Sequence, residues 1–350
     1  MEFHHIEFVV HRLEHWTKWF IHTLGFSPLE QGVPGTPHRS VWLRHGRVLL
    51  RLSAPGSQTD GYGQYLQAHP PGILDVALTT SDLDGLLSHA LARGGKLLQP
   101  PQLGWLGDTY GYWCRLGGWG SLRHTIVEPR LQKPAKPRQP DQLLAEIDHV
   151  VLNVGSHQLQ SVARWYSSVF DLHPQQHFMI RTPNSGLNSQ VMARDRVQLP
   201  INEPTTENSQ IQEFIVHNRG AGVQHVALRC PCLLTTVARL RPRGLKQLPV
   251  PPRYYQNLQQ RPSYRRDVIN LQQLQQQQLL VDWPKLQPTA VGARILQTFT
   301  PPLFELPTFF FELIERQPYT AAGSTQLTPG FGEANFQALF EVVEQQQRSA

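Results

Sequence analysis

The chain resembles itself across two segments that lie 150 residues apart. Residues 72–96 (GILDVALTTSDLDGLLSHALARGGK) align without gaps with residues 222–246 (GVQHVALRCPCLLTTVARLRPRGLK). In both segments an apolar run typical of a strand precedes an amphipathic helical pattern that ends at an Arg-Gly pair. Similarity at a fixed offset indicates a duplicated structural unit. Whatever fold the chain adopts must therefore place the same strand-helix unit in both of its halves.

A similar opening occurs earlier in each half. FHHIEFVV (3–10) resembles IDHVVLNV (147–154), and each is followed by a helical pattern that carries an aromatic pair. A strand followed by a helix thus occurs at four places, and the stretches after each helix have the composition of short strands. We predict an α+β fold in which four βαβββ modules pair into two domains. Each domain is an open, barrel-like curved sheet that encloses a cavity.

A basic, proline-rich stretch separates the two halves. LQKPAKPRQPDQ lacks apolar periodicity and is typical of a linker. We predict an N-terminal domain over 1–130, a linker over 131–144 and a C-terminal domain over 145–350. The length of 350 residues, about twice that of a usual domain, agrees with this division. The segment 331–347 carries one apolar stripe, which predicts a terminal helix that closes onto the C-terminal domain.

Composition excludes several classes of protein. The net charge of +6 comes from basic residues spread through the chain, which favours a small acidic substrate over nucleic acid. No window approaches the roughly 18 apolar residues of a membrane span. The N-terminus lacks the regions of a secretory signal, and three cysteines provide neither a disulfide framework nor a Cys-rich zinc site. We expect a soluble, cytoplasmic protein.

Two histidines stand at matching places in the repeat. His149 lies in IDHVVLNV and His225 in GVQHVALR, the first strands of the two C-terminal modules, so the fold would bring the imidazoles together. Glu312 lies in the aromatic run PTFFFELIERQ, where an unpaired carboxylate is costly. A single histidine in an apolar strand is usually a hydrogen-bonded core residue. Two histidines and one carboxylate, however, are the ligands of non-haem Fe(II) oxygenases, and they predict one Fe(II) ion per chain; Zn²⁺ and Mn²⁺ stay open as alternatives.

Eight motifs in order carry a resemblance to a known enzyme family. They are IDHVVLNV, LPINEP, SQIQEF, GAGVQHVAL, PPRYY, ILQTFT, FFFELIERQ and GFGEANFQALFE. On these motifs the chain resembles the bacterial 4-hydroxyphenylpyruvate dioxygenases of the vicinal-oxygen-chelate superfamily, most strongly over 145–347. The resemblance implies an Fe(II) enzyme that converts 4-hydroxyphenylpyruvate and O₂ to homogentisate and CO₂ by oxidative decarboxylation, ring hydroxylation and side-chain migration. It also implies a homo-oligomer, either a dimer or a tetramer, and leaves open whether homogentisate serves tyrosine catabolism or quinone and tocopherol synthesis.

The resemblance further implies roles for particular residues. The iron ligands of the family fall on His149, His225 and Glu312. Its polar substrate-binding residues fall on Ser189, Asn202, Gln210, Gln224 and Gln297. The wall of its pocket falls on Phe310, Phe331, Asn335 and Phe336. Aromatic side chains suit packing against a hydroxyphenyl ring, and hydroxyl and amide groups suit hydrogen bonds to its phenol.

Three other functions stay open. Hydroxymandelate synthase would use the same fold and substrate but hydroxylate the benzylic carbon. An extradiol ring-cleaving dioxygenase would use the same ligand types, and a non-catalytic binding protein would keep only the scaffold. PINEP with Asn202 and GFGEANF with Phe336 favour ring hydroxylation, and GFGEANF and SQIQEF argue against an extradiol dioxygenase. The presence of all three ligands argues against a non-catalytic protein.

Two further features are expected to carry no chemistry. His5, Asp75 and His124 stand at roughly the repeat positions of the three predicted ligands, and a second metal site is one interpretation of them. We favour a decayed duplicate that supports folding and oligomer contacts without a functional metal. The glutamine-rich stretch LQQLQQQQLL (271–280) is expected to be a polar helix face or a loop.

Overall fold

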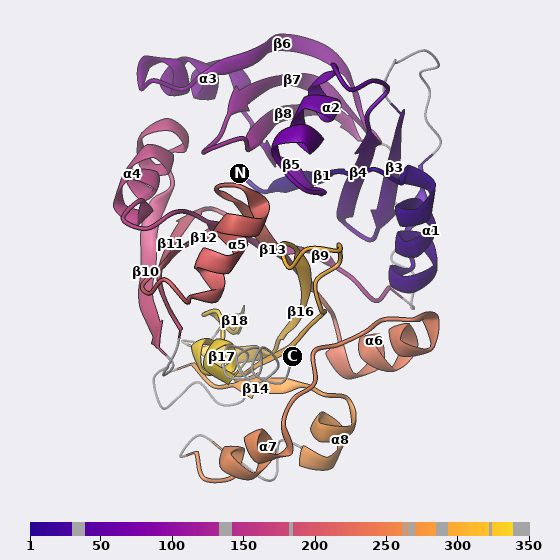
Figure 1. Cartoon of the computed structure of the whole chain (residues 1–350), viewed down its shortest axis with the longest axis vertical. Helices are drawn as coiled ribbons and strands as arrows, with labels where there is room; N and C mark the ends of the chain where they lie inside the picture. Colours follow the sequence, from indigo (N-terminus) through magenta and orange to yellow (C-terminus); the bar gives the residue numbers. More distant parts are fainter. Residues whose placement is uncertain are drawn as a thin grey trace.

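Two eight-stranded sheets with the same strand order form the framework of the protein (Figure 1). The structure is a computed structural model, and the residues it describes are 1–29, 39–132, 142–181, 185–261, 264, 270–284, 293–321 and 324–338. In the first sheet the strand order is β2-β3-β4-β1-β5-β8-β7-β6, and in the second it is β10-β11-β12-β9-β13-β16-β15-β14. The α+β fold predicted from the repeat is confirmed by this shared order.

The first half of the chain contains two βαβββ modules. Its strands are β1 (Phe3–Val9), β2 (Ser27–Pro28), β3 (Arg39–His45), β4 (Val48–Ala54), β5 (Gly72–Thr79), β6 (Leu97–Leu106), β7 (Thr109–Gly117) and β8 (Arg123–Gln132). Its helices are α1 (Leu13–Leu24), α2 (Gly61–Ala68) and α3 (Leu83–Ala92). The first strands of the two modules, β1 and β5, pair antiparallel at the centre of the sheet.

The second half repeats this pattern with an insertion. Its strands are β9 (Glu146–Asn153), β10 (His173–Arg181), β11 (Gly186–Arg194), β12 (Val197–Pro204), β13 (Gly222–Arg229), β14 (Leu280–Asp282), β15 (Ile295–Phe299) and β16 (Phe310–Arg316). Its helices are α4 (Leu159–Phe170), α5 (Gln210–Asn218), α6 (Leu233–Leu240), the 3₁₀ turn η1 (Arg241–Arg243), α7 (Pro252–Leu258) and α8 (Leu271–Gln276). The hairpin β17 (Pro318–Ala321) and β18 (Ser324–Leu327) follows β16. Helices α7 and α8 are inserted between α6 and β14.

Helix α4 shows how the sequence pattern becomes packing. Its stripe of apolar residues is buried, and the helix contacts β11 and β12. Burying each large apolar side chain stabilises the fold by about 1.5–3 kcal/mol. The helix ends at Asp171, which adopts the left-handed conformation (φ 56°) and donates its N–H to the carbonyl of Ser167. This termination aims the chain back along the sheet as β10.

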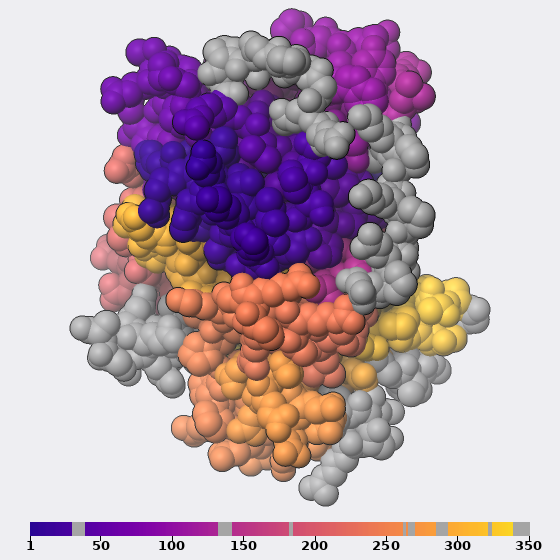
Figure 2. Space-filling view, turned by 90° about the vertical axis from the view of Figure 1, so that its right-hand side faces the viewer, coloured from indigo at the N-terminus to yellow at the C-terminus, as the bar shows by residue number. Residues whose placement is uncertain are grey.

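The two halves share one apolar core. The ring of Phe8 on β1 meets the ring of Phe309 edge-on at 5.0 Å, and the rings of Phe20 and Phe311 lie 5.9 Å apart. Figure 2 shows the N-terminal half lying directly against the C-terminal half. Phe8 and Phe311 pack against each other, each on one face of its sheet. Because side chains alternate along a strand, the neighbouring residues of the same strands point to the opposite face. We call it the inner face, and in the second sheet it carries Glu312.

Two predicted segments are described only in part. Strand β8 runs to Gln132, inside the linker predicted over 131–144, and residues 133–141 lie outside the described residues. The domain boundaries therefore stay a prediction. Residues 333–338 of the predicted terminal helix 331–347 are helical, and residues 339–347 lie outside the described part. Residues 331–338, which we call the closing segment, pack against the inner face of the second sheet.

The glutamine-rich stretch forms a short helix. In α8 the only buried side chain is that of Leu274, and the glutamines are on the solvent side or half-buried, as predicted. Among the residues that the structure describes, no helix has the length and apolar character needed to cross a membrane.

Candidate metal centre

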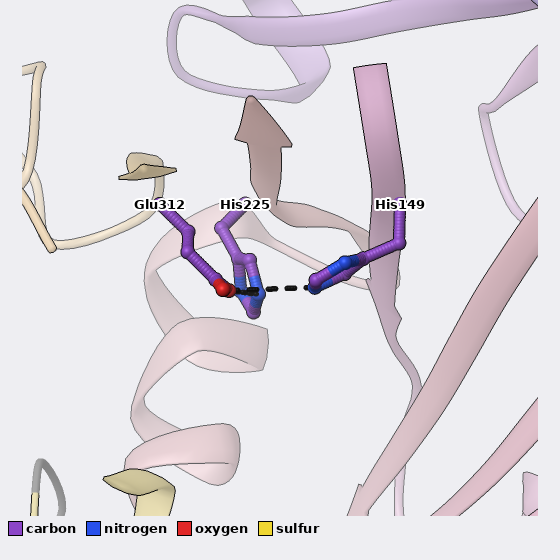
Figure 3. A group of neighbouring side chains, drawn as sticks. All are labelled: His149, His225 and Glu312. Carbon is purple, nitrogen blue, oxygen red and sulfur yellow. Dashed lines mark ion pairs between the residues drawn. The ribbon is translucent and has the colours of Figure 1, made fainter. Parts of the chain in front are cut away.

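Three neighbouring strands bring His149, His225 and Glu312 together (Figure 3). Ala227 on the central strand β13 pairs with His149 on β9 and with Glu312 on β16. His225 precedes Ala227 by two residues and therefore lies on the same face of the sheet. The register of the two strand pairs thus points all three side chains to one place on the inner face.

The three candidate ligand atoms converge and have no hydrogen-bond partner among the residues that the structure describes. Glu312 Oε2 lies 3.3 Å from His149 Nε2 and 3.5 Å from His225 Nε2, and neither contact has hydrogen-bond geometry. All three side chains are fully buried. Leaving a buried polar atom unpaired costs about 1–3 kcal/mol, so three such atoms facing one point are a strong indication of an absent partner. Two imidazole nitrogens and one carboxylate oxygen fit a divalent metal ion.

The electrostatics of the centre couple His149 to Glu312. Burial by itself lowers the pKa of His149, but the charge of Glu312 and the hydrogen bond to Asp148 outweigh it and raise this pKa to about 9. Burial raises the pKa of Glu312, whereas the charge of His149 lowers it to about 2. Burial lowers the pKa of His225. At neutral pH the metal-free centre therefore holds one positive and one negative charge.

In each of the three candidate ligands, the polar atom that does not face the other two forms a hydrogen bond with a neighbouring side chain. His149 Nδ1 lies 2.8 Å from Asp148 Oδ1, and His225 Nδ1 lies 3.3 Å from Gln224 Oε1. Because both partners are acceptors, each histidine carries a hydrogen on Nδ1, which leaves Nε2 as the atom that would bind a metal; in His149 the Nε2 proton must leave first. Gln297 Nε2 donates to Glu312 Oε1 at 2.8 Å. Gln224 and Gln297, which the sequence assigned to substrate, thus contact the ligands in this structure.

The predicted aromatic residues surround the two histidines. Phe310 stacks on His225 with ring centroids 4.7 Å apart, and Phe331 meets His149 edge-on at 5.1 Å. Phe336 of the closing segment lies 5.9 Å from His225. The closing segment thus completes an apolar wall next to the ligand atoms.

Asn335 and Gln297 hold the closing segment in place. Asn335 Nδ2 donates to Gln297 Oε1 at 2.7 Å, and Asn335 Oδ1 accepts from the hydroxyl of Tyr254 at 3.0 Å. Gln297 Nε2 also donates to the carbonyl of Phe331 at 2.9 Å. Gly332 adopts φ +70°, and a Cβ there would overlap the amide of Gln297. The position therefore requires glycine for both conformation and space.

A row of polar side chains runs away from the ligands across three strands. Ser189 on β11 pairs with Asn202 on β12, and Asn202 pairs with Asn153 on β9. Asn202 Nδ2 donates to Asn153 Oδ1 at 3.2 Å, whereas Ser189 Oγ and Asn153 Nδ2 are buried without a hydrogen-bond partner among the described residues. Sequence reasoning missed Asn153. Its signal was its spacing of four residues from His149, which puts both on one face of the strand.

Gln210 is not part of this row but lies at the start of α5. It is the first residue after the N-cap Ser209, and its backbone N–H donates to the hydroxyl of Ser185 at 3.2 Å. Helix α5 contacts β9, β11, β12 and β13. The side chain is half-buried.

The N-terminal counterpart of the metal centre differs from the expectation in one residue. His5 pairs with Ala77, the counterpart of Ala227, so His5 and Asp75 do occupy the positions of His149 and His225. Asp75 pairs with Arg123, so Ala77 lies opposite Thr125, and the counterpart of Glu312 is Thr125 rather than His124. The assignment of His124 was wrong by one residue. Because a one-residue slip changes the face of a strand, His124 points the other way and bonds the carbonyl of Val76 and the hydroxyl of Tyr166.

Arginines neutralise the buried acids on this inner face. Arg115 Nε lies 3.2 Å from Asp75 Oδ2, and Thr125 donates to the same carboxylate through its N–H and hydroxyl. Arg51 Nε lies 3.3 Å from Glu7 Oε1. The guanidinium groups of Arg115 and Arg51 thus balance the negative charges of the two buried carboxylates.

Both halves of the chain match profiles of one superfamily. Residues 4–112 and residues 146–261 each match a family described as the glyoxalase/bleomycin resistance protein/dioxygenase superfamily. One match begins in β1 and the other begins in β9, the first strands of the two halves, in agreement with the internal repeat.

Similar proteins span nearly the whole chain. The 4-hydroxyphenylpyruvate dioxygenase of Caenorhabditis briggsae is 31% identical over 99% of this chain and 91% of its own length. That of Danio rerio is 30% identical over the same shares. An uncharacterized protein of Synechocystis sp. is 35% identical over 90% of this chain and 87% of its own. A solved variant of 4-hydroxymandelate synthase from Streptomyces coelicolor, 24% identical, superposes with a TM-score of 0.84 over 99% of this chain and 98% of that one, which shows a shared fold.

Proposed function

Because the chain belongs to the 4-hydroxyphenylpyruvate dioxygenase family and is a dioxygenase, we propose that it converts 4-hydroxyphenylpyruvate and O₂ to homogentisate and CO₂. The proposal is supported most strongly by one observation. Three buried candidate ligand atoms converge beside an aromatic wall, and two further buried polar atoms lie on the same inner face; none of the five has a hydrogen-bond partner in the described part of the chain. An ion and an aromatic substrate with one hydroxyl would satisfy both sets.

His149, His225 and Glu312 would hold one Fe(II) ion per chain. When bound there, Fe(II) supplies the redox chemistry with O₂ and the Lewis acidity that binds the α-keto acid. Asp148, Gln224 and Gln297 fix the orientation of the three ligands before the ion arrives. Such preorganisation lowers the entropic cost of assembling the centre.

The remaining residues bind the substrate and exclude water. Phe310, Phe331 and Phe336 pack against the hydroxyphenyl ring of the substrate. This packing fixes the distance of the ring from the metal ligands. Ser189 Oγ and Asn153 Nδ2 form hydrogen bonds with its phenol, since both atoms are buried and otherwise unpaired. Asn202 and Gln210 support this end of the pocket. The closing segment, held by Gln297 and Tyr254, keeps bulk water from the reacting atoms.

Product analysis tests the proposal. Purified protein reconstituted with Fe(II) is given 4-hydroxyphenylpyruvate, O₂ uptake is recorded and the product is identified by chromatography. Homogentisate is expected. Formation of 4-hydroxymandelate would keep the metal centre but refute ring hydroxylation. No O₂ uptake by protein that has bound iron would refute the substrate.

Replacing Ser189 with alanine should weaken catalysis without weakening the fold. The hydroxyl is buried and bonds nothing in the described protein, so its loss leaves no protein group unpaired. A hydrogen bond to substrate is worth about 0.5–1.5 kcal/mol, so kcat/KM should fall roughly 2- to 10-fold while the melting temperature stays constant. Ser53→Ala is the matched control, because Ser53 donates to the buried Glu7 in the other half. It should lower the melting temperature and leave kcat/KM unchanged, and equal behaviour of the two variants would contradict the assignment of Ser189.

Metal binding is expected to release a proton. The pKa of about 9 means that His149 is protonated at pH 7 in the metal-free protein, and a metal can bind only the neutral ring. About one proton should therefore leave per ion at pH 7, and the affinity should fall about tenfold for each pH unit below 9. Titrating metal-free protein with Co²⁺ in buffers of different ionisation enthalpy measures this release. Binding without proton release at pH 7 would contradict the predicted charge of His149.

A further inference from the structure

Arg316, at the end of β16, binds the carboxylate next to the ligand His149. Its Nε donates to Asp148 Oδ2 at 2.8 Å and its Nη2 to Asp148 Oδ1 at 2.7 Å, a two-pronged pair. Asp148 Oδ1 also accepts from His149 Nδ1. The side chains of Arg316 and Asp148 are each only 7% exposed. Because the fork of the guanidinium fits a carboxylate in one orientation, Arg316 fixes the direction in which Asp148 holds the imidazole.

The same guanidinium also binds the chain that leads into the closing segment. Arg316 Nη1 donates to the carbonyls of Thr328 at 2.9 Å and Gly330 at 2.7 Å. The guanidinium lies 5.9 Å from the centre of the Phe331 ring, which itself contacts His149. Arg316 thus contacts, through separate nitrogens, the support of a metal ligand and the backbone before the closing segment.

We propose that Arg316 and Asp148 are positioning residues that couple the metal centre to the closing segment. The proposal rests on the metal site put forward above. Asp148 orients His149 toward the ion, and Arg316 orients Asp148 while it holds the carbonyls of residues 328 and 330. Replacing a residue that forms a hydrogen bond with a metal ligand typically lowers the metal affinity about 10–100-fold. The placement of the Arg316 side chain then determines both the position of the closing segment and the orientation of His149.

A neighbouring arginine supplies a matched control. Arg229 Nη2 lies 2.8 Å from Glu146 Oε1, so it also joins two strands that carry metal ligands. It lines the same cavity of about 300 Å³ as Asp148 and Arg316. Its partner Glu146 bonds Arg196 and contacts none of the three ligands. Loss of Arg229 therefore removes a comparable charge without touching His149.

Two measurements on metal-free full-length protein test the coupling. The first is the Kd for Co²⁺ and the second is hydrogen exchange of the amides of residues 331–338. Asp148→Asn should weaken Co²⁺ binding about 10–100-fold and change exchange little, because Arg316 keeps its two carbonyls. Arg316→Met should weaken binding similarly and also speed exchange. Arg229→Met should match the wild type in both.

Each other outcome has a defined meaning. Wild-type Co²⁺ affinity in both Asp148→Asn and Arg316→Met would overturn the proposal, and so would an equal loss in Arg229→Met. If Arg316→Met does not fold, Arg316→Lys keeps the charge but not the fork and should show the same two changes at smaller size. If the wild type bound no Co²⁺, the metal site itself would fail. The exchange measurement would then still decide whether Arg316 holds the closing segment.

Discussion

Replacing His149 with alanine is expected to abolish both metal binding and O₂ uptake. The variant loses one of the three ligand atoms, and kcat/KM should fall on the order of 10³-fold or more, since even partners behind a ligand cost 10–100-fold. It also leaves the buried Glu312 without its positive neighbour. Removing one member of a buried ion pair costs roughly 3–5 kcal/mol, so the metal-free variant should unfold at a lower temperature than metal-free wild type. Metal content, O₂ uptake and thermal unfolding measure the three effects.

His5 provides the control for this experiment. It occupies the position of His149 in the first sheet, where it packs edge-on against Trp42 at 4.8 Å. His5→Ala should bind the wild-type amount of metal and keep the wild-type turnover for each folded molecule. A His149→Ala protein that kept one equivalent of metal and its O₂ uptake would contradict the assignment of the centre.

Replacing Gly332 with alanine should impair closure over the pocket. The new Cβ would overlap the amide of Gln297, which cannot move away easily because it bonds Glu312, Phe331 and Asn335. A non-glycine residue in the left-handed region adds about 1 kcal/mol of strain. Together we expect about 3 kcal/mol, which corresponds to a fall in kcat/KM of roughly 10²-fold. Steady-state kinetics and hydrogen exchange of residues 331–338 would measure it.

Gly330→Ala separates strain from overlap. Gly330 also has a positive φ, +94°, but the nearest atom to its added Cβ is 3.8 Å away on Pro284. This variant should show the cost of strain alone, about 1 kcal/mol, and a correspondingly smaller loss of activity. Equal losses at the two glycines would argue that contact with Gln297 has no part in closure.

The strand-helix repeat and the ligand positions followed from the sequence because both are local patterns. A period of two along GVQHVALR already determines that His225 and Ala227 share a face, and the repeat determines that His149 lies on the neighbouring strand. The apolar stripe of α4 was likewise visible as a helical period, and the structure buries that same stripe. Such patterns need no knowledge of what lies across the molecule.

Register and distant hydrogen bonds depended on the tertiary structure. Sequence reasoning placed His124 at the position that Thr125 occupies, because a pairing register is set by the packing of whole strands and a slip of one residue exchanges the two faces. Arg316 binds Asp148 across 168 residues, and Asn202 meets Asn153 across 49. Gln297 turned out to hold Glu312 and the closing segment, which no local pattern indicates. The sequence by itself determined the fold and the three side chains of the candidate metal centre. Which groups orient those side chains was decided only by the tertiary structure, because it sets which buried donors and acceptors lie within hydrogen-bond distance of each other.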